Sequence, residues 1–545
     1  MADEASAPAP PAPAPGKPPA ERQHRSILRS ASVMTLMTLV SRVLGLVREQ
    51  VRAIYIGTGA SSDAFGLAST IPNLFRRLVA EGAMTAAFVP VFTEYIKKGD
   101  EEELRVFLSR FFTVLTFAVV LLTVLGIVLS PWIIETFFAE EFRNVPGKVP
   151  LTIALTQLMW PYLTFVTVAA MLQAVLNSYR IFGPSAFTPV LLNLAIIIAT
   201  IALSSAFADP AYALAVGFLV GGVLQVVFQI PYLRKHTPAR FGLVRDFWGP
   251  GVRRVLKIMG PGVFAAGIYQ IDVFVSQLIA AGLEGGSVSS LQYSLRLQEL
   301  VLGVFVVSVA QVILPNLSDH TAEGDHEGVK STIAYSTRLI GFVTLPATVV
   351  LFMIGPEIVR LLFQSGAFDA ESTQKTAFAL QFHGMGLLFI GQARVLQQVF
   401  FAYKDLKTPT LVAAFVAVLN IVLCYTLSVP LGHGGVALAG SLASAANTTI
   451  FITILERRLG GLGLPAILSR LGRMAVAAAV AGGVLWLLQT AWPSEHVARR
   501  LVLVVWVVVA LGLAGGAYLA AASALRVNEF SGILGAIRRR FGRKK

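Results

Sequence analysis

Long apolar runs separated by short polar connections make up most of this chain. A membrane-spanning helix needs about 20 mainly apolar residues. Fourteen runs meet this length, at 30–56, 64–94, 108–138, 153–178, 186–206, 212–233, 258–282, 288–317, 332–361, 376–402, 409–430, 434–456, 472–490 and 500–525. The pattern predicts an all-α polytopic membrane protein with fourteen transmembrane helices.

The composition agrees with a membrane protein and argues against a soluble one. Of 545 residues, 55% are hydrophobic and only 14% are charged. The formal net charge of +14 could indicate a nucleic-acid partner, but the Lys and Arg residues lie between apolar runs, where they orient a protein in a bilayer. We therefore expect no nucleic acid. The single cysteine, Cys424, excludes a disulfide framework.

The basic residues also predict the orientation. Connections after even-numbered runs hold most of them, for example at 97–105 and 234–257, whereas the opposite connections hold chiefly Arg143, Lys148, Lys375 and Arg499. Both termini are therefore expected in the cytoplasm. The Pro/Ala-rich segment 1–26 should be a disordered tail. The basic segment 531–545 should be a second tail, either solvated or resting on anionic membrane lipids.

Two stretches of sequence indicate an internal duplication. "LQAVLNSYRIFGPSAFTPVLLNL" at 172–194 aligns with "LQQVFFAYKDLKTPTLVAAFVAVLNI" at 396–421, with Tyr179 and Tyr403 among the matches at an offset of 224. Pro90 in "FVPVFTEY" and Pro315 in "ILPNLSDH" pair within two residues of that register. Each copy holds six helices, an even number, so the copies should be parallel.

The duplication predicts two six-helix lobes related by a pseudo-two-fold axis along the membrane normal. The N-lobe is expected at 27–245, the C-lobe at 246–460, and two additional helices at 461–530. Lobes of this kind usually enclose a central site.

Several charged residues lie inside the apolar runs. An Arg or Lys at the bilayer centre costs on the order of 3 kcal/mol, so such residues usually face a bundle interior or a wet cavity. The candidates are Arg42, Arg48, Asp63, Arg76, Arg77 and Glu81 in the first lobe, and Asp272, Arg296 and Glu299 in the second. A break at Gly45 would let the side chains of Arg42 and Arg48 converge, because residues six apart on an ideal helix diverge by about 120°.

Two interpretations of these charges remain open. Arg77 with Glu81, and Arg296 with Glu299, have helical spacing, so each pair could neutralise itself on its own helix. As a set, the arginines outnumber the acids. A surplus of guanidinium groups favours an anionic ligand, and arginine forks suit the oxygens of a pyrophosphate.

Asp272 and Asn420 form a separate candidate site. A carboxylate and an amide oxygen could hold a monovalent cation such as Na⁺, or a proton, but an Asp bonded to a neighbouring helix is an equally good interpretation.

Motifs for enzymatic chemistry or ATP coupling are absent from the sequence. The chain contains no G-x-x-x-x-G-K-[ST] loop, no pair of histidines at i and i+4, and no nucleophile elbow. We therefore expect a transporter, driven by the membrane potential or an ion gradient, with no cofactor beyond a possible Na⁺ or H⁺.

The segments "SRVLGLVRE", "SSDAFGLASTIPNLFRRLVAEGAMTAAFVPVFTEY", "MGPGVF", "YSLRLQELVLGVF" and "ILPNLSDH" closely resemble the MurJ/MviN family of lipid II flippases. This family belongs to the MOP exporter superfamily, which includes the MATE multidrug and toxin extruders. The resemblance covers 27–530. It implies a V of two six-helix lobes, with two further helices that form a hydrophobic groove.

The resemblance also implies a function and a site. A monomer in the bacterial cytoplasmic membrane would move lipid II, the undecaprenyl-pyrophosphate-linked disaccharide-pentapeptide, to the outer leaflet by alternating access. The implied cavity residues are Ser41, Arg42, Arg48, Arg76 and Arg296, with the acids Asp63, Glu81 and Glu299; Arg77 lies beside them. Asp272 and Asn420 resemble the sodium site of some members, and Cys424 stands where a further acidic ligand is expected.

Two other functions remain alternatives. One is a different exporter of the same superfamily, for polysaccharide-linked lipids or drugs, although a drug-cation exporter would need a net acidic cavity. The other is a membrane enzyme acting on polyprenyl phosphates, which would need paired carboxylates or a metal motif on a sizeable loop.

Overall fold

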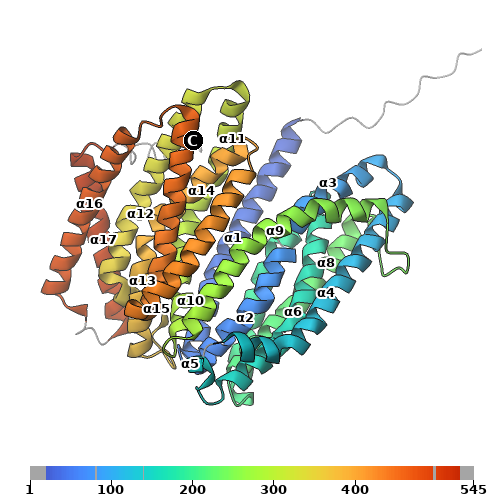
Figure 1. The fold of residues 1–545 in the computed structure, drawn as a ribbon, viewed down its shortest axis with the longest axis horizontal. Helices are drawn as coiled ribbons and strands as arrows, with labels where there is room; N and C mark the ends of the chain where they lie inside the picture. The colour runs from blue at the N-terminus through green and yellow to red at the C-terminus, as the bar shows by residue number, and fades with distance from the viewer. Residues whose placement is uncertain (1–19, 80–82, 139, 495–498, 528–545) are drawn as a thin grey trace, which may run out of the picture.

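The computed structural model describes residues 20–79, 83–138, 140–494 and 499–527, which form helices joined by short loops (Figure 1). The helices are α1 (Ala20–Ile56), α2 (Ala60–Val79), α3 (Ala83–Lys98), α4 (Glu101–Phe137), α5 (Glu140–Arg143), α6 (Lys148–Ser178), α7 (Gly183–Leu203), η1 (Ser204–Ala206), α8 (Ala211–His236), α9 (Pro250–Ala281), α10 (Ser287–Val301), η2 (Leu302–Val306), α11 (Val307–Glu323), α12 (His326–Phe363), α13 (Ala370–Met385), α14 (Leu387–Ala402), α15 (Lys407–Leu459), α16 (Leu464–Ala491) and α17 (Arg500–Ala524). Within these ranges, nine helices are long and apolar enough to cross a membrane, or ten if α13 and α14 form one bent span. The expected all-α, multi-pass membrane fold is confirmed.

Helices and predicted runs do not correspond one to one. A non-helical residue, Gly432 (φ 55°, ψ −136°), divides the 53-residue helix α15 into two parts that cover two predicted runs. The run at 64–94 is covered by α2 and α3, with 80–82 outside the described residues. The run at 288–317 is α10 and α11 joined by the π-helical turn η2. Helix α1 begins at Ala20, within the segment expected to be a tail.

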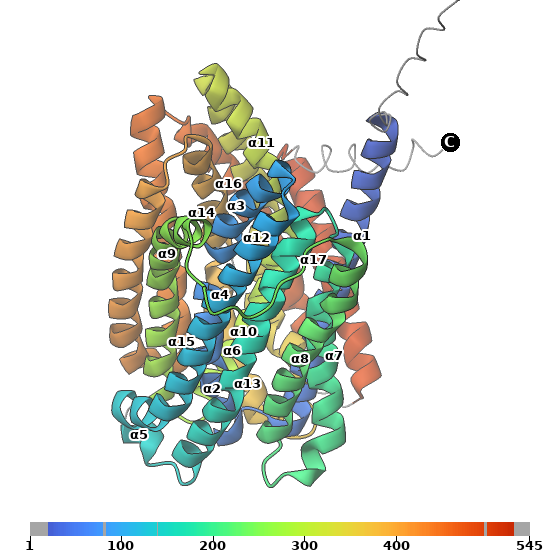
Figure 2. The ribbon, with the colours of Figure 1, turned by 90° about the vertical axis from the view of Figure 1, so that its right-hand side faces the viewer.

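The helices gather into two groups (Figure 1). In the first, α6 packs against α2, α4 and α8, and α7 packs against α8 and α1. In the second, α12 packs against α13, α14 and α16, and α14 packs against α15. Helix α9 contacts both groups, because it packs on α15 and also on α2 and α3. Figure 2 shows α4, α7 and α8 running in roughly the same direction.

The last two helices cover the outer side of α12. Trp506 is fully buried in α17, and the Tyr518 hydroxyl donates a hydrogen bond to the Phe342 carbonyl at 2.9 Å. The apolar cluster here joins α12, α16 and α17. The two helices are thus attached to the second group of helices through α12.

Two helix ends repeat at the offset found in the sequence. After α6, Arg180 adopts a left-handed conformation (φ 62°), and the Ile181 N–H donates to the Leu176 carbonyl at 2.9 Å. After α14, Lys404 does the same (φ 57°), and the Asp405 N–H donates to the Phe400 carbonyl at 2.9 Å. Positive φ is uncommon for residues other than glycine, so two such caps 224 residues apart support a duplication.

Two helix beginnings repeat as well. Asp100 caps the N-terminus of α4, and Asp325, 225 residues later, caps that of α12. Each Asp accepts a hydrogen bond from a backbone N–H of the first turn and follows a left-handed glycine. These two caps lie outside the segments whose sequences match, so they are further support for a duplication.

Candidate functional site

A cavity of about 880 Å³ lies between the two groups of helices. Its described charged lining comprises Arg48, Glu49, Arg52, Arg76, Arg77, Arg296 and Glu299. Polar residues such as Asn73, Gln173, Asn177 and Gln270 complete much of the remaining wall, together with apolar residues from α6, α7 and α8. Both groups of helices contribute to the wall, since Arg48 belongs to α1 of the first group and Arg296 to α10, which packs against α13 of the second.

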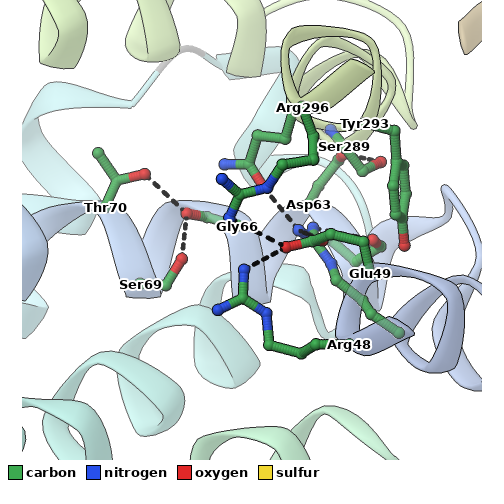
Figure 3. Close-up of polar contacts among 12 residues, drawn as sticks. Arg48, Glu49, Asp63, Gly66, Ser69, Thr70, Ser289, Tyr293 and Arg296 are labelled. Atoms are coloured by element: carbon green, nitrogen blue, oxygen red, sulfur yellow. Dashed lines mark hydrogen bonds and ion pairs between the residues drawn. The ribbon is translucent and has the colours of Figure 1, made fainter. Parts of the chain in front are cut away.

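Glu49 is the shared partner of three arginines in this cavity, and Figure 3 shows two of them, Arg48 and Arg296, beside it. Its carboxylate lies 2.5 Å from an Nη atom of Arg48 and 3.6 Å from Nη atoms of Arg52 and of Arg296. Arg296 also pairs with Glu299 at 2.9 Å, as the helical spacing predicts. Asn193 on α7 accepts a hydrogen bond from Arg48 at 3.2 Å. Helices α1, α7 and α10 are thereby joined through one charged network.

The cavity carries a surplus of positive charge. Among its described lining residues, five arginines face two glutamates, which leaves three formal positive charges. Charge buried in a membrane protein is costly unless a partner or water neutralises it. The arrangement therefore suits an anionic ligand, and the planar guanidinium groups match phosphate oxygens.

Five of the predicted cavity residues line this cavity: Arg48, Arg76, Arg77, Arg296 and Glu299. Ser41, Arg42 and Asp63 are not among the lining residues, and Glu81 lies outside the described residues. Arg76 donates a hydrogen bond to Asn73 at 3.0 Å, and Arg77 is exposed.

The break considered at Gly45 is absent, because α1 continues as one helix from Ala20 to Ile56. Residues six apart on a continuous helix point in different directions. Arg48 accordingly points into the cavity, whereas the guanidinium of Arg42 lies against Gly303 in the π-helical turn η2. Ser41 accepts a hydrogen bond from Asn193 through its backbone carbonyl at 3.2 Å.

Asp63 is buried near one end of the cavity, where it joins the two groups of helices. It forms an ion pair with Lys148 at 3.1 Å, and both side chains are at most 2% exposed. It also accepts hydrogen bonds from the N–H groups of Gly286 and Ser289 and from the Ser289 hydroxyl, at 2.8–3.0 Å. A carboxylate at the N-terminus of α10 accepts hydrogen bonds from backbone N–H groups that have no partner within the helix. Its negative charge also interacts favourably with the helix dipole.

Further contacts close this end of the cavity. The Thr58 hydroxyl donates to the Ser372 hydroxyl at 2.7 Å, and the Ala367 N–H donates to the Ile54 carbonyl at 2.8 Å. Gly57 has a left-handed conformation (φ 55°), and a side chain there would collide with the Ala367 carbonyl. The opposite end is open, since Tyr269 is 56% exposed and Arg77 is exposed.

An ion pair between a half-buried lysine and an exposed glutamate lies near the closed end. Lys375 pairs with Glu284 at 2.9 Å and donates to the Gly285 carbonyl at 3.1 Å. The hydrogen bond from Lys375 lowers the pKa of the Glu284 carboxyl below its ordinary value.

Three residues of this site did not emerge from the sequence: Glu49, Arg52 and Lys148. Glu49 and Arg52 lie inside the first apolar run, so the criterion of charge in an apolar run applies to them as well. Neither was among the predicted cavity residues. Lys148 was expected in a polar connection, but it is the first residue of α6 and only 2% exposed.

Asp272 and Asn420 do meet, as hydrogen-bonding partners. The Asn420 amide donates to Asp272 at 2.8 Å and to the Ser276 hydroxyl at 3.2 Å, and the Cys424 thiol lies 3.8 Å from the Asn420 amide oxygen. The described residues contain no group of three His, Cys, Asp or Glu placed to hold a metal. A cation coordinated by carboxylate and carbonyl oxygens would need more oxygen ligands than these side chains supply, so the fit is poor.

A multi-pass helical fold with a positively charged cavity between two groups of helices defines a membrane transporter rather than an enzyme. The family model described as lipid II flippase MurJ matches residues 52–507. The chain belongs to this family, and the expected resemblance is confirmed.

Individual relatives agree with this assignment. A probable lipid II flippase MurJ of Treponema pallidum is 35% identical over 441 residues, covering 79% of this chain and 82% of the relative. One of Vibrio cholerae is 35% identical over 492 residues, covering 87% and 92%. The lipid II flippase MurJ of Burkholderia cenocepacia is 33% identical over 436 residues, covering 79% and 84%.

Solved structures show the same fold. A lipid II flippase MurJ in an inward closed conformation superposes with a TM-score of 0.76 at 24% identity, covering 91% of this chain and 99% of the other. An inward-facing MATE multidrug transporter of the MOP superfamily gives 0.65 at 14% identity, covering 79% and 95%. These likenesses concern the fold alone.

Proposed function

We propose that this protein moves lipid II from the cytoplasmic to the outer leaflet of the bacterial cytoplasmic membrane. The observation that carries the proposal is the cavity in which five arginines face two glutamates. Lipid II carries its head group on a diphosphate, the anion that paired guanidinium groups bind well. The family to which the chain belongs is described as that of the lipid II flippase MurJ.

We propose fourteen spans in two parallel six-helix lobes, with α16 and α17 outside the repeat. The repeated caps at offsets of 224 and 225, and the division of α15 at Gly432, support this count. With the excess of basic residues in the cytoplasm, both termini lie there, and the open end of the cavity faces the cytoplasm. The protein acts as a monomer.

In this mechanism, the diphosphate enters from the open end and binds Arg48, Arg76 and Arg296. Arg48 and Arg296 share Glu49, and Arg296 also pairs with Glu299, so the ligand competes with two carboxylates for these arginines. Separation of Asp63 from the N-terminus of α10 then opens the closed end, which is the outer end in this orientation. The lobes rock, and the head group leaves on the other side while the lipid tail stays in the bilayer.

The driving force in this mechanism is the membrane potential. A negative interior favours return of a positively charged empty cavity to the cytoplasmic side, by about 2.3 kcal/mol per charge per 100 mV for a full crossing. Asp272, which accepts a hydrogen bond from Asn420, is the candidate for an additional coupling proton, because the few oxygen ligands at this position fit Na⁺ poorly.

Depletion of the protein in its host tests the function. Lipid II should accumulate in the cytoplasmic leaflet, inaccessible to reagents added outside the cell. Arg48→Ala should fail to restore growth. Arg254→Ala, which removes an exposed ion pair with Glu94 that contributes little to stability, should restore it. Accumulation in the outer leaflet would contradict the proposal.

A further inference from the structure

Arg52 lies near the end of α1, at the closed end of the cavity, and is only 6% exposed. Its guanidinium lies between two aromatic rings, 5.1 Å from the centroid of Phe65 and 5.0 Å from that of Tyr293. It donates hydrogen bonds to the Gln292 side chain at 3.0 Å and to Ser62 at 3.1 Å. Ser62 and Phe65 belong to α2, and Gln292 and Tyr293 to α10. Arg52 therefore holds the two groups of helices together.

The charge of Arg52 is incompletely satisfied in this closed arrangement. Its Nε is buried and has no hydrogen-bond partner. Its ion-pair partner, Glu49 at 3.6 Å, is shared with Arg48 and Arg296. A buried donor without an acceptor is costly, and a buried guanidinium with only part of a carboxylate more so. The aromatic rings offset part of this cost.

We propose that Arg52 is a second anion-binding position, which receives the phosphate groups of the ligand when the closed end opens. This inference rests on the proposed function. When α10 moves away, Arg52 loses Gln292 and Tyr293 and keeps Ser62, so its N–H donors become free for phosphate oxygens. Arg52 follows Arg48 by four residues, about 6 Å along the helix. The diphosphate thus passes along α1 from Arg48 to Arg52 as it moves outward.

The experiment measures binding of inorganic pyrophosphate to purified full-length protein in lipid nanodiscs. Arg52→Gln is compared in two backgrounds: the otherwise unmodified chain, and Asp63→Asn, which weakens the contact with α10. We expect Arg52→Gln to lower the affinity about tenfold in the Asp63→Asn background, the effect of losing one hydrogen bond to a charged group. In the closed, unmodified background, the change should be less than about twofold. Arg52→Lys, which keeps the charge, should restore part of the lost affinity.

Opening of the outer end is measured separately in whole cells. A cysteine at Ser69, a residue of the cavity wall, is introduced into a chain in which Cys424 is replaced by serine. A membrane-impermeant maleimide added outside should label it more in Asp63→Asn than in the unmodified chain. Tyr293→Leu, which removes the ring on the α10 side of Arg52, provides a second opened background.

Each result decides for or against the proposal. An equal loss of affinity in closed and opened backgrounds, or none in either, would overturn it. So would failure of both Asp63→Asn and Tyr293→Leu to raise labelling. Arg48→Gln is the reference, because it should lower affinity in the closed background. If that variant binds normally, the proposed function is wrong; if only Arg52→Gln binds normally when open, only this inference is wrong.

Discussion

The guanidinium of Arg296 on α10 lies 3.6 Å from the carboxylate of Glu49 on α1, so one acidic side chain connects helices from the two halves of the sequence. The same carboxylate binds Arg48 at 2.5 Å. Glu49 therefore offsets repulsion among arginines that otherwise have few acidic partners in the described lining.

Replacement of Glu49 by Gln should abolish transport while the protein still accumulates in the membrane. Without the carboxylate, Arg48, Arg52 and Arg296 repel one another and lose the geometry that receives a diphosphate. Growth of a depleted host measures the effect, and immunoblotting of membranes controls for protein level. Glu49→Asp keeps the charge and should retain partial activity. Full activity of Glu49→Gln would contradict this role.

Substitutions at the Asp63–Lys148 pair should destabilise the protein unequally. Breaking a buried ion pair by removing one partner costs about 3–5 kcal/mol. Lys148→Met should lie at the lower end, because Asp63 keeps three donors from Gly286 and Ser289. Asp63→Asn leaves the Lys148 ammonium buried without a carboxylate and should cost more. Thermal unfolding in detergent measures both, and the double variant should recover part of the loss of Asp63→Asn.

Replacement of Gly57 by Ala should open the closed end of the cavity. The left-handed backbone at Gly57 costs a residue with a side chain about 1–2 kcal/mol, and the new methyl group would collide with the Ala367 carbonyl. Labelling of a cysteine at Ser69 from outside should therefore increase. Gly59→Ala is the matched control, since no atom lies within 4 Å of its added side chain. Equal labelling in both variants would show that Gly57 does not hold this end closed.

Replacement of Na⁺ by choline should leave lipid II transport in proteoliposomes unchanged under a fixed membrane potential. Asp272, Ser276, Asn420 and Cys424 satisfy one another by hydrogen bonds and supply few oxygens for a cation. A sodium dependence that disappears in Asp272→Asn would contradict this expectation and assign the cation site to Asp272.

Several features of the fold were predictable because they depend on local composition. Apolar runs of sufficient length specify helices that cross a membrane, and the repeated "LQ…Y" segments predicted an offset that recurs in the caps at Arg180 and Lys404. The break considered at Gly45 does not occur, because glycine permits a break in a helix but does not require one. Gly432 breaks α15 instead.

The sequence by itself determined that the chain is a helical membrane protein with charged residues in its apolar runs, since the period and length of such runs are local properties. It also carried the family resemblance. Tertiary structure alone decided which charges share a cavity. Glu49 serves three arginines, whereas Asp63 binds Lys148 and caps α10 outside the cavity. A charge on one helix is stabilised by partners from distant segments, and their positions follow only from how the helices pack.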